Sequence, residues 1–184
     1  MREYAELANS LNVRHSYSMF MASPNHPMFQ DFIFNEDDLS QVAKNISAQN
    51  QSAPFQDVPI SQTGLSCRNG CEAGNKLVSI AANGDIFPCH MLQTPEMRLG
   101  NLADMESSLQ KAVFSESNPF QNLNYSMINE CKDCKYKELC GAGCRGRSFL
   151  YHKDIVSQDA YCGFIKTFYI NTFNGIKSKL SVEK

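Results

Sequence analysis

The stretch Cys131-Lys-Asp-Cys134-Lys-Tyr-Lys-Glu-Leu-Cys140-Gly-Ala-Gly-Cys144 decides which kind of protein this chain forms. It places four thiols within fourteen residues, in the spacing C-x2-C-x5-C-x3-C. The other four cysteines of the chain lie outside it: Cys67, Cys71, Cys89 and Cys162. Eight thiols make two sets of four, which is the ligand number of two tetrahedral sulfur sites. The sequence therefore predicts two metal sites.

Composition narrows the class of protein. A chain of 184 residues with 42% hydrophobic residues and a net charge of −2 is typical of a globular protein and not of a nucleic-acid binder that works through bulk charge. The first residues include Glu3 and Glu6 and contain no apolar core of a signal peptide. No apolar run approaches the roughly 20 residues that span a bilayer. We therefore expect a cytoplasmic protein without membrane partners, whose reduced cysteines bind metal.

The first third of the chain has helix and strand patterns but no cysteine. Apolar spacing predicts a helix over residues 3–11, and alternation over residues 12–20 predicts a strand. A second helix begins near Asn35, which would cap it, and buries one apolar face: Leu39, Val42, Ala43 and Ile46. Residues 47–66 are polar and without periodicity, which indicates a connecting segment. We therefore divide the chain into residues 1–60, the last units of a larger α/β domain with a linker, and residues 61–184.

A hairpin is the clearest local structure of the cysteine-rich part. Residues 77–89 contain two strand-like runs around Asn83-Gly84, which predicts a type I′ turn. That register pairs Ile80 with Phe87 and places Cys89 opposite Val78, beside the loop that holds the first two cysteines. Helices are predicted over residues 103–114 and from about Asp159 onward. The last helix carries Cys162 in its first turn, and its predicted inner face consists of Tyr161, Phe164, Ile165, Phe168 and Thr172.

The spacing of the cysteines favours iron–sulfur over zinc without deciding between them. Zinc sites usually combine two C-x2-C knuckles, and this chain has a single C-x2-C. A C-x3-C pair supplies two ligands from a helical turn, and all-cysteine ligation suits iron–sulfur clusters. The glycines Gly141, Gly143 and Gly146 allow the backbone to approach closely and to turn N–H groups toward sulfur. Spacing alone leaves open which four thiols share a site.

Basic residues flank the cysteines and could compensate a negatively charged cluster. A solvated basic face is an equally good interpretation of each lysine. These residues are Arg68, Lys76, Lys132, Lys135, Lys137, Arg145 and Arg147.

The whole cysteine pattern resembles the SPASM signature. The matching features are Cys71, Gly84 and Cys89, then C-x2-C-x5-C-x3-C, then Cys162, with the phrases Leu99-Gly-Asn-Leu102 and Cys140-Gly-Ala-Gly-Cys144-Arg-Gly. SPASM domains extend radical S-adenosylmethionine enzymes that modify peptides and proteins, and the resemblance covers about residues 64–165. It implies an α+β fold: the end of a partial (β/α) barrel, followed by a small cysteine-rich domain of a hairpin, loops and helices around two clusters.

The resemblance also implies an interleaved set of ligands for two [4Fe–4S] clusters. The first auxiliary cluster would take Cys67, Cys71, Cys89 and Cys144. The second would take Cys131, Cys134, Cys140 and Cys162. The partners implied are a peptide or protein substrate, a radical S-adenosylmethionine core, and a reductant such as flavodoxin or ferredoxin, with no nucleic acid.

Two departures from the family pattern limit what carries over. The radical-generating motif C-x3-C-x2-C does not occur in this chain, so S-adenosylmethionine is expected only with a barrel supplied elsewhere. Sulfatase maturases have an aspartate base at the position of His90. An imidazole there could take a proton near neutral pH, although such a histidine also serves as a packing or hydrogen-bonding residue.

The function expected is therefore that of an auxiliary iron–sulfur cluster domain in a peptide- or protein-modifying radical S-adenosylmethionine enzyme, serving substrate binding and electron transfer. Two alternatives come from other classes. A zinc-stabilised interaction module would be colourless and stable in air. A stand-alone electron-transfer protein would carry two clusters without a catalytic core.

Overall fold

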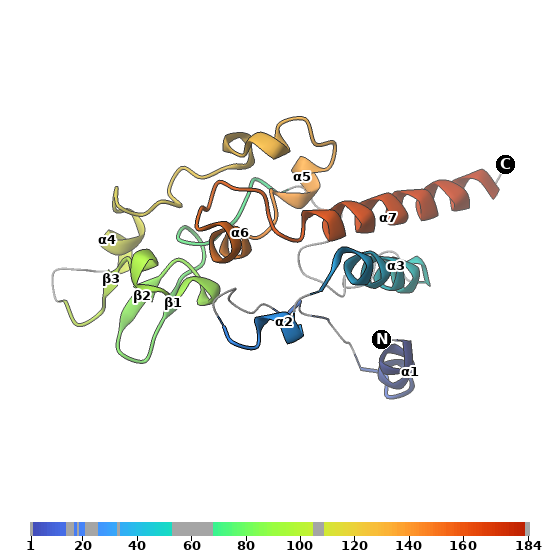
Figure 1. Cartoon of the computed structure of the whole chain (residues 1–184), viewed down its shortest axis with the longest axis horizontal. Coiled ribbons are helices and arrows are strands. Elements are labelled where there is room, and N and C mark those ends of the chain that lie inside the picture. Colours follow the sequence, from blue (N-terminus) through green and yellow to red (C-terminus); the bar gives the residue numbers. More distant parts are fainter. Residues whose placement is uncertain are drawn as a thin grey trace. The chain divides into compact units, whose positions relative to one another are not determined.

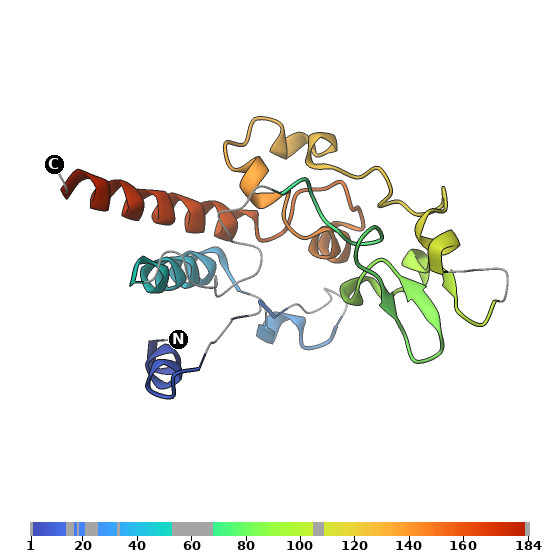
Figure 2. The ribbon, with the colours of Figure 1, turned by 180° about the vertical axis from the view of Figure 1, so that it is seen from behind.

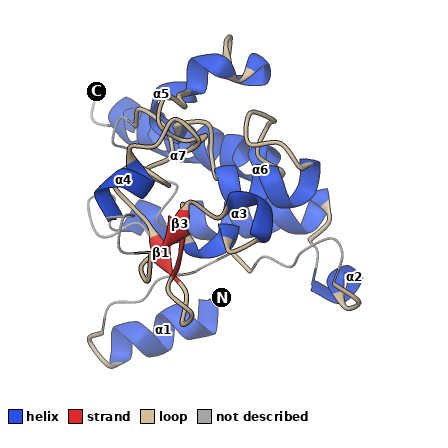
Figure 3. Cartoon of the chain, turned by 90° about the vertical axis from the view of Figure 1, so that its left-hand side faces the viewer, coloured by secondary structure: helices blue, strands red, loops and turns tan. Residues whose placement is uncertain are grey.

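The computed structural model describes residues 2–13, 17, 19–20, 26–32, 34–52, 68–104 and 109–182. The chain folds as two compact units, one of residues 1–67 and 160–184 and the other of residues 68–159. Among the described residues, strands occur only in the second unit (Figure 3). The predicted boundary at residue 60 lies outside the described residues.

The first unit contains α1 (Arg2–Ser10), α2 (Phe29–Phe32), α3 (Glu36–Ser52) and α7 (Cys162–Val182). Helices α3 and α7 run side by side and pack against each other (Figure 1). The predicted inner face is confirmed for Phe164, Ile165 and Phe168 of α7 and for Tyr161 just before it, which are all buried, whereas Thr172 is half-buried. This helix pair forms the apolar core of the unit.

The predicted cap of α3 is confirmed. Asn35 Oδ1 accepts a hydrogen bond from the backbone N–H of Asp38 at 2.8 Å, and the Asn35 N–H donates back to the Asp38 carboxylate at 3.4 Å. Of the predicted apolar face, Leu39, Ala43 and Ile46 are buried and Val42 is half-buried. The connecting segment predicted from residue 47 begins too early, because the Ser47 hydroxyl donates to the Ala43 carbonyl at 2.7 Å and the helix continues to Ser52.

The predicted first helix is confirmed as α1, but of the apolar residues whose spacing predicted it, Tyr4, Leu7, Ala8 and Leu11, only Ala8 is buried. Ala5 and Ala8 are buried, whereas Tyr4 and Leu7 are 53% and 56% exposed. The chain then leaves the helix through Asn12, whose φ is +51°, and the Val13 N–H donates to the Ala8 carbonyl at 3.0 Å. These residues complete a helix end, and no strand forms among the described residues of the predicted strand 12–20.

The second unit carries a three-stranded antiparallel sheet in the order β1 (Ser79–Ile80), β2 (Asp85–Phe87) and β3 (Gly100–Asn101), visible in Figure 2. The hairpin exists, but its predicted register is wrong by one residue: Ile80 pairs with Ile86, not with Phe87. The Gly84 N–H donates to the Ala81 carbonyl at 2.9 Å, and Gly84 has a φ of +86°. A three-residue turn ending in a left-handed glycine thus replaces the predicted two-residue turn.

Short helices fill the rest of the unit. They are η1 (His90–Leu92), η2 (Pro95–Met97), α4 (Leu109–Val113), η3 (Tyr125–Met127), η4 (Asn129–Cys131), α5 (Lys137–Cys140) and α6 (Arg145–His152). The helix predicted over residues 103–114 exists only as α4 among the described residues, because Asn101 Oδ1 accepts from the Ala103 N–H at 2.7 Å and holds a turn there. Residues 105–108 lie outside the described residues.

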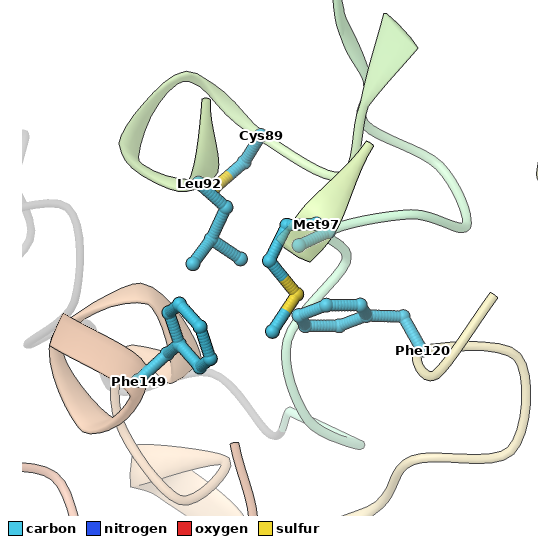
Figure 4. Packing of buried hydrophobic residues seen from close by; sticks show 6 residues of the cluster. Cys89, Leu92, Met97, Phe120 and Phe149 are labelled. Atoms are coloured by element: carbon cyan, nitrogen blue, oxygen red, sulfur yellow. The ribbon is translucent and has the colours of Figure 1, made fainter. Parts of the chain in front are cut away.

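The core of the second unit joins segments that are far apart in the sequence (Figure 4). The Met97 side chain extends between the rings of Phe120 and Phe149, with Leu92 beside them. Cys89 belongs to the same buried cluster, and Cys71 packs against it. One predicted metal ligand is therefore part of the core, and a second packs against it.

Candidate metal centre

Three of the predicted ligands converge in the second unit from three separate segments. Cys71 lies in the loop before β1, Cys89 lies two residues after the end of β2, and Cys144 is the N-cap residue of α6. Cys89 and Cys144 are buried, and Cys71 is half-buried. Cys89 belongs to a buried cluster against which Cys71 and Met91 pack, and Met91 Sδ lies 3.7 Å from Cys144 Sγ. Burial raises the pKa of Cys71 and Cys89, and a negative charge on Cys144 would raise it further. These three residues are called the core thiols below.

A buried asparagine holds the loop of Cys71. Asn118 Nδ2 donates to the Gly74 carbonyl at 2.6 Å and to the Val113 carbonyl at 2.7 Å. Gly74 has a φ of +67°, and a Cβ there would lie 2.9 Å from Asn118 Oδ1, so only glycine fits. The Gly74 N–H also donates to the Pro88 carbonyl at 2.9 Å. This bond ties the Cys71 loop to the residue before Cys89.

A buried ion pair holds Cys144. Arg147 Nε and Nη2 each lie 2.7 Å from an oxygen of Asp159, and the two side chains are 4% and 2% exposed. Asp159 Oδ2 also accepts the backbone N–H of Cys144 at 2.5 Å. Gly143 makes this approach possible, because a Cβ there would lie only 2.7 Å from Asp159 Cβ. Asp159 thus fixes the backbone from which the Cys144 thiol projects.

Burial controls the protonation of Cys71 and Cys89. Burial raises the pKa of Cys89 to about 11, while N–H groups of Met91 and Leu92 oppose the shift. Burial also raises the pKa of Cys71, against N–H groups of Ala73 and Arg145. The neutral forms of Cys71 and Cys89 are therefore favoured until a bound cation compensates their thiolates. The backbone donors already point at the sulfurs, as they do around iron–sulfur clusters.

Gly146 and Met91 line the side of Cys144. A Cβ at Gly146 would lie 3.0 Å from Met91 Cβ and 3.5 Å from Cys144 Sγ, so the close approach predicted for this glycine is confirmed. Cys144 Sγ is 3.7 Å from Met91 Sδ. The thioether shields one face of the core thiols from water.

The remaining ligands of the opening stretch lie on a different run of turns. The Cys134 N–H donates to the Cys131 carbonyl at 3.1 Å, and Cys140 ends α5. Cys131 packs with Ile128 and Ala142 in a second buried cluster that contains none of the core thiols. Cys140 and Cys144 are not two ligands of one helical turn, as the C-x3-C spacing had predicted, because Gly141, Ala142 and Gly143 all have φ between +62° and +73°.

The last two predicted ligands are Cys67 and Cys162. Cys67 lies outside the described residues, and Cys162 is the first residue of α7 in the other unit. The seven described cysteines are reduced thiols. Within the described residues, no group of three or more His, Cys, Asp or Glu side chains is arranged to hold a single metal ion. His90 follows the buried Cys89 with an exposed side chain.

The flanking cations differ sharply in their surroundings. Lys76, Lys132 and Lys135 are exposed, as the interpretation of a solvated face expected. Arg145 and Arg147 are only 1% and 3% exposed. The sequence analysis included both arginines among the basic residues. It missed Asp159 and Asn118, because no local pattern indicates that they contact Cys144 and Gly74, which lie 15 and 44 residues away in the sequence.

The donor set fits a thiolate-bound cofactor. The core thiols are close enough to repel one another as thiolates, backbone N–H groups point at two of them, and a thioether and apolar core cover them. A cationic cluster core would offset the burial that raises the pKa of Cys71 and Cys89.

Comparison with known proteins supports the same chemistry. Residues 71–135 match the family model of SPASM, described as an iron-sulfur cluster-binding domain. A cysteine-type anaerobic sulfatase-maturating enzyme of Clostridium perfringens (strain ATCC 13124) is 30% identical over 107 residues, covering 53% of this chain and 28% of that enzyme. The PqqA peptide cyclase of Xanthomonas axonopodis pv. citri is 30% identical over 92 residues, covering 48% of this chain and 24% of the cyclase.

Solved structures show the same fold. The chain matches "Native anSMEcpe with bound AdoMet" with a TM-score of 0.59 and 18% identity, over 95% of this chain and 51% of that one. It matches the same protein with bound AdoMet and a Kp18Cys peptide with a TM-score of 0.56 and 20% identity, over 87% and 46%. The chain thus spans about half of the matched structures. None of the helices that the structure describes has the length and apolar character needed to cross a bilayer.

Proposed function

The chain carries a SPASM iron–sulfur domain homologous to the C-terminal part of anaerobic sulfatase-maturating radical S-adenosylmethionine enzymes, and from this premise we propose that it holds two auxiliary [4Fe–4S] clusters that serve substrate binding and electron transfer during modification of a peptide or protein. One observation carries the proposal: Cys71, Cys89 and Cys144 converge from three segments in a buried, amide-rich setting. Such a setting favours thiolates only when a cation is bound.

The proposed ligands of the first cluster are Cys67 and the core thiols. Those of the second are Cys131, Cys134, Cys140 and Cys162. The burial of Cys131 in a separate cluster from the core thiols supports this division over a local one. Bound clusters would supply one-electron transfer. The chain's own residues hold the thiols in place, direct N–H groups at the sulfurs and exclude water.

The rest of the reaction is proposed to depend on parts outside this sequence. A radical S-adenosylmethionine core would bind S-adenosylmethionine and generate the radical, and a flavodoxin or ferredoxin would supply electrons. A peptide substrate agrees with the relative whose structure contains one. His90 is exposed beside Cys89 and is the proposed proton acceptor from that substrate.

Metal content tests the proposal most directly. The protein is expressed and purified anaerobically, iron and acid-labile sulfide are quantified, and Mössbauer spectra are recorded. We expect about eight iron and eight sulfide per chain, the content of two cubane clusters. A colourless protein with two zinc ions would show that the alternative of a zinc-stabilised module is correct.

The division of ligands has its own test. Cys144→Ala and Cys89→Ala should remove the same electron paramagnetic resonance (EPR) signal and about four of the eight iron atoms. Cys131→Ala should remove the other signal. If Cys144→Ala and Cys131→Ala removed the same signal and left the Cys89-dependent one, the local division of the opening stretch would be the right one.

A further inference from the structure

Arg145 is a buried positive charge without a negative partner among the described residues. Its side chain is 1% exposed, and it makes hydrogen bonds only to neutral backbone oxygens. Nη1 donates to the carbonyls of Ile155 at 2.8 Å and Ser157 at 2.6 Å, and Nη2 donates to the Ala142 carbonyl. Its Nε is buried and has no hydrogen-bond partner among the described atoms.

The neighbouring arginine shows what a compensated charge looks like in the same helix. Arg147 makes two hydrogen bonds to the carboxylate of Asp159, so that pair carries no net charge. Arg145, two residues earlier, lacks such a carboxylate within the described residues, although burying a guanidinium without an opposite charge is costly. A compensating negative charge is therefore to be sought close to Arg145.

Two of the core thiols lie close to Arg145. The backbone N–H of Arg145 donates to the sulfur of Cys71, and its guanidinium charge favours the thiolate of Cys71. Arg145 also follows Cys144 directly and opens α6. A cubane core held by four thiolates carries about two negative charges, and one-electron reduction adds another. The reduced form gains more from a nearby cation than the oxidised form does.

We propose that Arg145 is the buried counter-charge of the cluster held by Cys71, Cys89 and Cys144, and that it raises the reduction potential of that cluster. The inference rests on the proposed function, because it requires a cluster at the core thiols. Arg145 acts through the cluster and touches no substrate, so it is a positioning and tuning residue.

The test compares variants of the full chain, reconstituted anaerobically with iron and sulfide. Arg145→Gln and Arg145→Met remove the charge. Arg145→Lys keeps the charge but loses the planar fork that bonds three carbonyls. Lys153→Gln removes an exposed cation just after α6 and serves as the control. The readout is a dithionite titration followed by EPR, using the signal that is lost in Cys89→Ala.

The charge-removing variants should be harder to reduce. At a fixed potential, their ratio of reduced to oxidised cluster should fall at least about tenfold, which corresponds to about 59 mV for a one-electron couple. Arg145→Lys should stay within about threefold of the wild type, and Lys153→Gln should not change. Equal shifts in the lysine and glutamine variants, or none in either, would overturn the inference.

Failure to assemble is also informative. If the glutamine and methionine variants took up no cluster while Arg145→Lys did, the charge itself would be required, which supports the inference. If all three failed, Arg145 would act through its carbonyl bonds, and the inference would be wrong. Absence of iron and sulfide in the wild type would instead refute the proposed function, before any variant is compared.

Discussion

Replacing Asp159 by asparagine should destabilise the second unit strongly. Asp159 accepts two hydrogen bonds from Arg147 and one from the backbone of Cys144. Asparagine has nearly the same shape and keeps one oxygen for the Cys144 N–H. The main loss is therefore the negative charge opposite Arg147, whose side chain is only 4% exposed.

The size of the effect follows from that burial. Removing one partner of a buried ion pair typically costs about 3–5 kcal/mol, because the other charge stays buried and uncompensated. With a urea m-value of about 2 kcal/mol per molar, the unfolding midpoint should fall by about 1.5–2.5 M. Much of this should return in the double variant Asp159→Leu with Arg147→Met, which removes both charges and fills the space with apolar atoms.

The measurement is urea unfolding of the anaerobically reconstituted protein, followed by circular dichroism and by cluster absorbance. Arg98→Gln is the matched control, because it also breaks an arginine–aspartate pair, with Asp85, but the Arg98 side chain is 44% exposed. The control should leave the midpoint almost unchanged. If Asp159→Asn lowered the midpoint no more than the control does, the buried pair would not be what holds the Cys144 segment.

Three further changes test the surroundings of the thiols. Because burial raises the pKa of Cys89 to about 11 and that of Cys71 in the same direction, the unfolded thiols ionise first. In the metal-free protein, the stability that these two thiols contribute should be fully present below about pH 9 and should be lost as the pH rises toward 11. Urea unfolding measured over that pH range would detect the loss, and a free energy of unfolding that rises with pH would contradict the prediction. Gly143→Ala combines a left-handed φ of +73° with overlap on Asp159 and should cost more than about 2 kcal/mol, whereas Gly163→Ala, with no atom within 4 Å of the added Cβ, should not destabilise. Asn118→Ala should cost about 1–3 kcal/mol, because it leaves two buried carbonyls without their donor. It should also speed the loss of iron to a chelator, and an unchanged rate would show that the Cys71 loop does not help to hold the metal.

The sequence predicted well those elements whose signal is local. Asn35 and the apolar spacing after it located α3, because a cap and a helical period lie within the element itself. The hairpin was found from Asn83-Gly84 for the same reason, but its register was not. Two-residue and three-residue turns share that dipeptide, and they differ in whether Ala82 lies in the strand or in the turn.

The residues that hold the core thiols in place could not be predicted from sequence patterns. Asp159 reads as an ordinary helix start, yet it accepts the N–H of Cys144. Arg145 and Arg147 are both arginines, two positions apart, yet Arg145 bonds neutral carbonyls and Arg147 bonds a carboxylate. Contacts between segments decide these roles, and a single sequence contains no signal for them.

The stretch Cys140-Gly-Ala-Gly-Cys144 shows why spacing alone does not fix a ligand set. In a helix, two cysteines four positions apart lie on one face and suit one metal site. Here three consecutive residues with positive φ interrupt the helix, so Cys140 ends α5 and Cys144 begins α6. Ala142 is not a glycine, and L residues adopt this conformation at a cost, so surrounding contacts must maintain it. Arg145 bonds the Ala142 carbonyl and Asp159 the Cys144 N–H, which fixes the interruption from both ends. The separation of Cys144 from its neighbours in sequence is thus a property that the fold maintains, and it is what makes an interleaved pair of clusters possible.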